Sequence, residues 1–137
     1  MGTVIRPKIS QKNKYWIEKH RHYELKHFCL QYPIWKKALA SLIDIGVSST
    51  AGEIRGNDIS DPTSEIAVKR LRYSDKIALV EEAAKEADST LSPYILKAVT
   101  EGLSYTHLST QMHIPCSRDT YYDRYRRFFW LLNKSRK

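Results

Sequence analysis

Apolar residues recur with helical spacing through most of the chain, and no segment alternates apolar and polar residues as a half-buried strand does. The helical pattern begins near residue 13, and its periodic positions, at i, i+4, i+7 and i+11, are Trp16, His20, Tyr23 and His27. Because the residue before a proline avoids the α region, this run is expected to stop before Pro33. A second helix is predicted from Pro33 to Gly46, where glycine suits a C-cap. Its apolar stripe consists of Trp35, Leu39, Leu42 and Ile43.

The middle of the chain consists of a loose stretch followed by another helical region. Residues 46–60 are rich in glycine, serine, threonine and asparagine, which predicts a linker. Asp61 and Pro62 then form a helix start, with Asp61 as N-cap and Pro62 at the first helical position. The following segment is rich in Glu, Lys and Ala. It is predicted to form one long helix, or two helices broken near Tyr73, ending near Asp88.

Three further helices are predicted in the C-terminal third. The first begins with Ser92 as N-cap, has a proline in its first turn, and stops at Gly102. The second begins with Ser104 as N-cap and ends before a short turn at residues 113–115. Together these elements bring the chain to the start of its last helix.

The last helix and the turn before it have the spacing of a helix-turn-helix. The helix is predicted to begin after Cys116 or Ser117 as N-cap and to run to about Leu132. Its inward face, at helical spacing, consists of Tyr121, Tyr125, Phe128 and Leu132. Leu108 and Ile114 are expected to pack beneath it. In a helix-turn-helix the second helix lies in the major groove of DNA, so the opposite face of this helix is the candidate DNA-reading surface.

The chemistry of that face suits base and phosphate contacts. Arginine bonds a guanine edge with two hydrogen bonds, and threonine, aspartate and tyrosine bond other base edges. Arg124 and Arg127 are assigned to phosphates, which position a protein without specifying sequence. The full set of candidate DNA-binding residues is Ser117, Arg118, Thr120, Tyr122, Asp123, Arg124, Arg126 and Arg127.

The charge distribution also fits double-stranded DNA as a partner. The chain has 23 Lys and Arg against 15 Asp and Glu, a formal net charge of +8. Residues 1–40 hold nine basic and two acidic side chains, residues 41–92 hold six and ten, and residues 93–137 hold eight and three. Basic regions attract phosphate backbones, but they attract acidic proteins and anionic membranes too. Charge alone therefore does not select DNA.

Several classes of protein are not expected from this sequence. Cys29 and Cys116 form no CxxC pair, so neither a disulfide framework nor a cysteine metal site is indicated. The chain shows no membrane-span pattern and no signal-peptide pattern, so we expect a cytoplasmic protein without a membrane partner. No nucleotide-binding or hydrolase motif is found, so we expect no enzyme and no cofactor.

Two clusters of chemically active side chains are more typical of an ordinary surface than of a functional site. The histidines beside Cys29 lack metal-ligand spacing, so no metal site is expected; the cluster is His20, His22, His27 and Cys29. Glu82 and Glu86 share one face of the middle helix, beside lysines typical of a solvated surface.

Three phrases of the sequence resemble one family. The segment GLSYTHLSTQMHIPCSRDTYYDRYRRFFWLL at residues 102–132 resembles the C-terminal helix-turn-helix of RinA/ArpU-type phage and prophage transcriptional regulators, which is similar to region 4 of bacterial sigma factors. The phrases SDPTSEIAVKR at residues 60–70 and YPIWK at residues 32–36 resemble other elements of these proteins. The resemblance implies a regulator of late phage genes in a bacterial host cell, binding promoter DNA with the last helix and host RNA polymerase as a further partner.

The expected molecule is all-α, with a sigma-region-4-like helix-turn-helix at its C-terminus. Its expected parts are a basic flexible arm (1–13), an N-terminal helical hairpin (14–45), a linker (46–60), a middle helical segment (61–90) and the helix-turn-helix region (91–137). A homodimer is expected, because dimers read two DNA half-sites. Two alternatives stay open. One is a phage DNA-packaging protein similar to small terminase subunits, which would form a large ring. The other is a basic helical adaptor for RNA polymerase or another acidic protein.

Overall fold

The computed structural model describes the backbone of residues 11–51 and 62–136, and these residues form helices and turns without any strand. Their six helices are α1 (Lys19–Leu30), α2 (Tyr32–Ala51), α3 (Pro62–Ala87), α4 (Ser92–Glu101), α5 (Tyr105–Met112) and α6 (Arg118–Ser135). The all-α class expected from the periodicity is confirmed. Three predictions concern residues that the structure does not describe. They are most of the basic segment predicted at residues 1–13, much of the linker predicted at residues 46–60, and the predicted N-cap Asp61.

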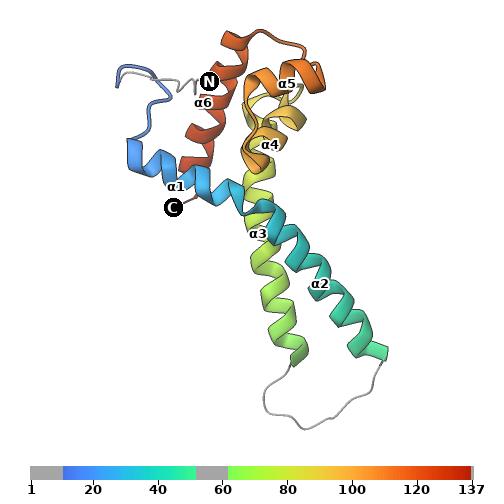
Figure 1. The fold of residues 1–137 in the computed structure, drawn as a ribbon. Coiled ribbons are helices and arrows are strands. Elements are labelled where there is room, and N and C mark those ends of the chain that lie inside the picture. The colour runs from blue at the N-terminus through green and yellow to red at the C-terminus, as the bar shows by residue number, and fades with distance from the viewer. Residues whose placement is uncertain (1–10, 52–61, 137) are drawn as a thin grey trace.

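The helices form two parts, which we call the arm and the head (Figure 1). The arm consists of residues 36–51 of α2 and residues 62–76 of α3, which run antiparallel and project away from the other helices. The head consists of the remaining described residues, and α3 continues into it to pack against α4 and α6. The helical hairpin of this molecule is therefore α2 with α3, whereas the sequence had led us to expect one within residues 14–45.

A single hydrophobic core lies in the head and at its junction with the arm. Burying one large apolar side chain contributes roughly 1.5–3 kcal/mol, so this cluster holds the helices of the head together. Its buried members are Leu25, Phe28, Cys29, Trp35, Ile77, Val80, Ala83, Ala84, Ala87, Leu91, Ile95, Ala98, Val99, Leu108, Ile114, Tyr121, Phe128, Phe129 and Leu132.

The first helix begins later than its sequence pattern predicts and buries a different face. Asn13 folds the chain into a turn, because its side-chain oxygen accepts a hydrogen bond from the Tyr15 N–H at 2.8 Å. Glu18 caps α1 by accepting hydrogen bonds from the backbone N–H groups of His20 and Arg21. The residues of the predicted stripe, Trp16, His20, Tyr23 and His27, are all exposed. The buried side of α1 is formed by Leu25, Phe28 and Cys29.

The two arm helices are longer than the local sequence signals predict. Gly46 does not end α2, which continues to Ala51. A glycine inside a helix costs about 1 kcal/mol relative to alanine, and the packing of α2 along α3 offsets that cost. The helix α3 is continuous through Tyr73, so the first of the two predicted alternatives is correct. No helix in the described parts of the chain has the length and apolar character that a membrane span requires.

The junction between α3 and α4 depends on one carboxylate. Asp88 follows the last residue of α3 and accepts hydrogen bonds from the backbone N–H groups of Thr90 and Leu91, both at 2.9 Å. The helix α4 begins at Ser92, so the predicted N-cap, Ser92 itself, is one residue too late, and Leu91 occupies that position without a side-chain cap. Gly102 ends α4 as predicted, with φ 72° in the left-handed region that glycine tolerates best.

Candidate nucleic-acid interface

The helices α5 and α6 are joined by a tight turn at residues 113–117, and local hydrogen bonds define both ends of that turn. Ser104 caps α5, as predicted, through its Oγ, which accepts from the His107 N–H at 3.1 Å. His113 ends α5 in the left-handed region with φ 53°. The buried residue Ile114 follows, and its N–H donates to the Leu108 carbonyl oxygen at 3.1 Å. The backbone conformation and the hydrogen bonds of this turn therefore set the direction of α6 relative to α5.

Ser117 starts α6. Its Oγ accepts a hydrogen bond from the Thr120 N–H at 3.2 Å, which decides between the two N-caps that the sequence allowed. Ser117, Arg118, Asp119 and Thr120 are all exposed. The first turn of α6 therefore presents a cluster of polar side chains to solvent at the end of the head where α5 also lies (Figure 1).

Tyr105, in the first turn of α5, lies beneath this cluster. Its hydroxyl donates to the Cys116 carbonyl oxygen at 2.6 Å and so ties the start of α5 to the turn. The Arg118 guanidinium carbon lies 5.1 Å from the centre of the Tyr105 ring, within the range of a cation–π contact. Tyr105 thereby orients the exposed Arg118. Tyr105 is not among the residues predicted for the site, because an aromatic residue at the start of a helix is more typical of the core.

The inward face of α6 attaches it to the core. Tyr121, Phe128 and Leu132 are buried as predicted, Phe129 is buried as well, and Tyr125 is only partly buried. Burial raises the pKa of the Tyr121 hydroxyl far above its ordinary value. That hydroxyl has no hydrogen-bond partner among the described residues.

Two of the eight predicted DNA contacts, Asp123 and Arg124, are paired with each other, and Arg124 also contacts Asp88. Arg124 Nε donates to Asp88 Oδ2 at 3.0 Å, and the same guanidinium forms an ion pair with Asp123. Burial raises the pKa of Asp88, but the backbone N–H of Leu91 and the Arg124 guanidinium outweigh this effect and hold that pKa below its ordinary value. Arg124 thus links α6 to the end of α3.

The other three predicted contacts, Tyr122, Arg126 and Arg127, are partly covered. The Tyr122 ring packs edge-on against Tyr121, with the ring centres 5.0 Å apart. Arg126 is half-buried, and its Nε has no partner among the described residues. Arg127 donates to the Tyr15 hydroxyl at 3.3 Å and to the Glu86 carbonyl oxygen at 3.4 Å.

The N-terminal part of the chain covers the C-terminal half of α6. Arg21 Nε donates to Asn133 Oδ1 at 2.6 Å, and the rings of Tyr15 and Trp130 meet edge-on at 5.5 Å. Of the eight predicted residues, the structure therefore brings Ser117, Arg118 and Thr120 together at the free end of α6. It gives Arg124 and Arg127 partners within the molecule.

His22 is part of this cover. Its ring lies 4.8 Å from the Phe129 ring, edge-on, and 6.5 Å from the Tyr125 ring. Burial, together with the nearby charge of Lys26, lowers the pKa of His22 to about 4, so the imidazole is neutral near pH 7.

The remaining candidate groups do not converge on a site. Within residues 11–51 and 62–136, no three His, Cys, Asp or Glu side chains are placed to hold a metal ion. Both Cys29 and Cys116 are free thiols, and burial raises the pKa of Cys29 to about 12. Glu82 and Glu86 are exposed on α3.

Comparison of the chain with models of protein families, with curated proteins and with solved structures returns no match.

Proposed function

We propose that this protein is a sequence-specific DNA-binding transcriptional regulator of the RinA/ArpU type, acting on late phage or prophage genes. In this proposal α5, the turn and α6 form a sigma-region-4-like helix-turn-helix, and the N-terminal end of α6 enters the major groove. The observation that carries the proposal is the exposed first turn of α6, capped by Ser117, with Arg118 oriented by Tyr105.

The exposed end is the part of a recognition helix that contacts base edges in helix-turn-helix proteins. A guanidinium held on an aromatic ring loses less freedom on binding than a free side chain, which favours a specific contact. We assign base contacts to Arg118, Thr120 and Ser117, with Tyr122 at the border of the covered region. The N–H groups at the start of α6 suit a phosphate.

The N-terminal part of the chain covers the C-terminal half of α6, so fewer residues of this helix are assigned to DNA. Arg124 and Arg127 have partners inside the molecule, so we assign them chiefly to the structure of the head. Arg126, at the border, can reach a phosphate. The long stem of arginine allows its charged end to extend into solvent while its Nε is buried.

Selection of bound duplexes from random DNA, followed by binding curves at two salt concentrations, tests the proposal. We expect one recovered motif, and Arg118→Gln should weaken binding to that motif by about 1–3 kcal/mol and relax the preference at one base position. Arg124→Gln is the matched control, since it removes the same charge from the same helix and should change binding much less. Recovery of no motif, with an affinity that follows salt alone, would overturn the specific-regulator assignment.

One observation favours a second candidate, a packaging protein similar to small terminase subunits. The arm projects from the head as an oligomerisation segment would (Figure 1). A packaging protein would assemble into a ring of many subunits and bind DNA with little sequence preference. The mass of the protein in solution separates the two functions, because a monomer or dimer is incompatible with such a ring.

A further inference from the structure

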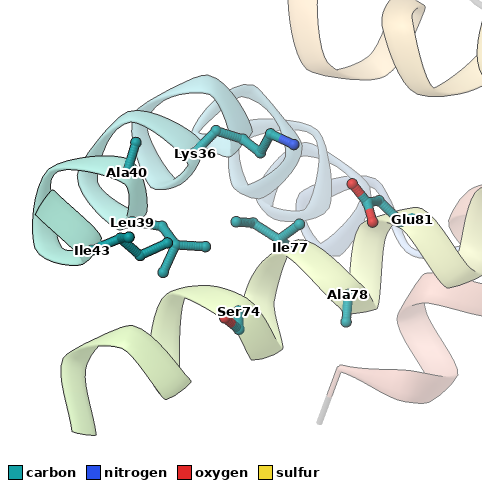
Figure 2. A pocket seen from close by; sticks show the side chains of 8 residues that line it. All are labelled: Lys36, Leu39, Ala40, Ile43, Ser74, Ile77, Ala78 and Glu81. Atoms are coloured by element: carbon teal, nitrogen blue, oxygen red, sulfur yellow. The ribbon is translucent and has the colours of Figure 1, made fainter. Parts of the chain in front are cut away.

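The arm has a groove along one side that no described segment of the chain fills. Figure 2 shows the residues that line this groove between α2 and α3. The volume of the groove is about 390 Å³. Its walls are mostly apolar or small, and they include Leu39, Ala40 and Ile43 from α2 and Ser74 and Ala78 from α3. Small side chains allow the backbone of another helix to approach closely. The groove is therefore suited to the packing of another helix.

The apolar surface continues from the groove toward the tip of the arm. Leu71 is 62% exposed, and it lies three residues before Ser74 and seven before Ala78, on the same face of α3. Ile43, on the opposite wall, is 40% exposed. Exposed apolar side chains on both sides of the groove suit an interface with another molecule.

The charges at the end of the groove nearest the head indicate what covers it. Lys36 on α2 and Glu81 on α3 lie at the end nearest the head, and the Tyr32 hydroxyl donates to Glu81 (Figure 2). Ile43 and Leu71 lie toward the tip. The two walls of the groove thus carry opposite charges at the end nearest the head, with apolar side chains at the other end.

We propose that this groove binds the arm of a second copy of the chain, in a parallel arrangement in which α2 of each copy faces α3 of the other. A half-turn about an axis parallel to the arm places Lys36 of each copy opposite Glu81 of the other. It also places Ile43 opposite the segment around Leu71. Such an interface is self-complementary, as a twofold dimer requires, and it forms a four-helix bundle.

The opposite orientation is disfavoured by the same residues. A half-turn about an axis perpendicular to the arm would set Lys36 and Glu81 against Ile43 and Leu71. Charged groups would then lose water without gaining a partner, which is costly. Charge complementarity therefore favours a second copy as the partner, in the parallel direction.

The parallel arrangement places both heads at the same end of the dimer. If the proposed function is correct, the two copies of α6 can then bind two half-sites of one DNA duplex. This consequence rests on the proposed function, whereas the dimer itself does not.

The mass of the full chain, measured by light scattering or sedimentation over a range of concentrations, tests the interface. We expect a monomer–dimer equilibrium, which Leu71→Lys weakens by about tenfold or more in dissociation constant. The matched control is Ile34→Lys. Ile34 is 64% exposed, and it lies two residues before Lys36 and so on nearly the opposite side of α2, where a lysine should leave dimerisation unchanged. Circular dichroism checks that both variants are folded.

Charge reversal tests the orientation. Lys36→Glu and Glu81→Lys should each weaken the dimer, and the double variant should restore it. A monomer at every concentration, an assembly larger than a dimer, or a dimer that tolerates Leu71→Lys would overturn the inference. Association unaffected by Lys36→Glu would overturn the parallel arrangement.

DNA binding separates this inference from the proposed function. Leu71→Lys should still bind a single half-site but lose the cooperative binding of two. A dimer that binds no DNA would contradict the proposed function but not the interface. A monomer that binds a specific motif would contradict the interface but not the proposed function.

Discussion

Two tyrosines beside the turn between α5 and α6 bury their hydroxyls in opposite ways. The Tyr105 hydroxyl donates to the Cys116 carbonyl oxygen, whereas the Tyr121 hydroxyl has no partner among the described residues. A buried polar group without a partner lacks the hydrogen bonds that water gives it in the unfolded chain, which costs about 1–3 kcal/mol. The two hydroxyls therefore have opposite effects on stability.

Replacement of each tyrosine by phenylalanine measures this difference. We expect Tyr121→Phe to raise the free energy of unfolding by about 1 kcal/mol and Tyr105→Phe to lower it by a similar amount. Urea unfolding of the two variants beside the original protein gives both values. A clear loss of stability in Tyr121→Phe would mean that its hydroxyl is hydrogen-bonded in solution.

His22 gives the head a dependence on pH. Its pKa falls from 6.5 to about 4 on folding, because burial against Phe129 and Tyr125 and the charge of Lys26 disfavour the imidazolium. Between these values the unfolded chain binds the proton more tightly than the folded one. Stability is therefore full above about pH 6.5 and falls as the pH drops toward 4. Because the side chain is only partly buried, solvent screening reduces the effect. We expect the free energy of unfolding to fall by about 2 kcal/mol across this pH range.

Urea unfolding at pH 7 and pH 5 checks this prediction. His22→Leu should flatten the dependence in this window, because the remaining carboxylates with lowered pKa values, Glu24 and Asp88, respond at more acidic pH. His20→Leu, which removes an exposed imidazole from the same helix, is the matched control for the loss of a histidine. An equal slope in His22→Leu would assign it to another group.

At the level of elements, the sequence predicts the helices well and their ends unevenly. Gly102, Ser104 and Ser117 act at helix ends through their own side chains or backbone, so the local sequence reveals them. The ends of α1 and α2 depend on other factors. Glu18 is an uncommon N-cap, and α2 passes through Gly46 because it lies along α3, a contact that no local pattern contains.

The candidate site also has a part that the local sequence predicts and a part that only the fold reveals. The exposure of the first turn of α6 follows from its own periodicity, and the sequence predicts it. The partner of Arg124, however, is Asp88, 36 residues earlier in the chain. The cover over the C-terminal half of α6 comes from Tyr15 and Arg21, more than a hundred residues away in sequence. Only the fold shows that a basic residue on the right face of a helix is already paired.

Arg124 is accordingly predicted to stabilise the join between α3 and α6. The side chains of Arg124 and Asp88 are 37% and 21% exposed, so the pair is partly screened, and Arg124→Gln should lower the free energy of unfolding by about 0.5–1 kcal/mol. Asp88→Asn should cost a similar amount, and the double variant should cost less than the sum of the two. Additive losses in this double-mutant cycle would show that the two side chains do not interact.

At the scale of the whole molecule, the arm and the head differ in how firmly they are held. Along α3, the buried residues lie toward the head: Ile77, Val80, Ala83, Ala84 and Ala87. Residues 64–72 of the same helix are exposed, apart from the half-buried Ile66. One continuous helix thus joins a part that anchors the core to a part with little buried surface.

Hydrogen exchange along α3 should reveal this difference. In protein diluted until light scattering gives the mass of a monomer, amides of residues 77–87 should exchange only through global unfolding, because opening them breaks the core. Amides of residues 66–74 should exchange faster by at least about two orders of magnitude, through local opening of the arm. At concentrations that favour association, protection should rise in the arm of the original protein and stay low in Leu71→Lys, because that variant lacks the covering copy. Equal protection along the whole of α3 in the monomer would mean that the arm is as stable as the core without a partner. The low stability of the arm would then no longer support its association with a second copy.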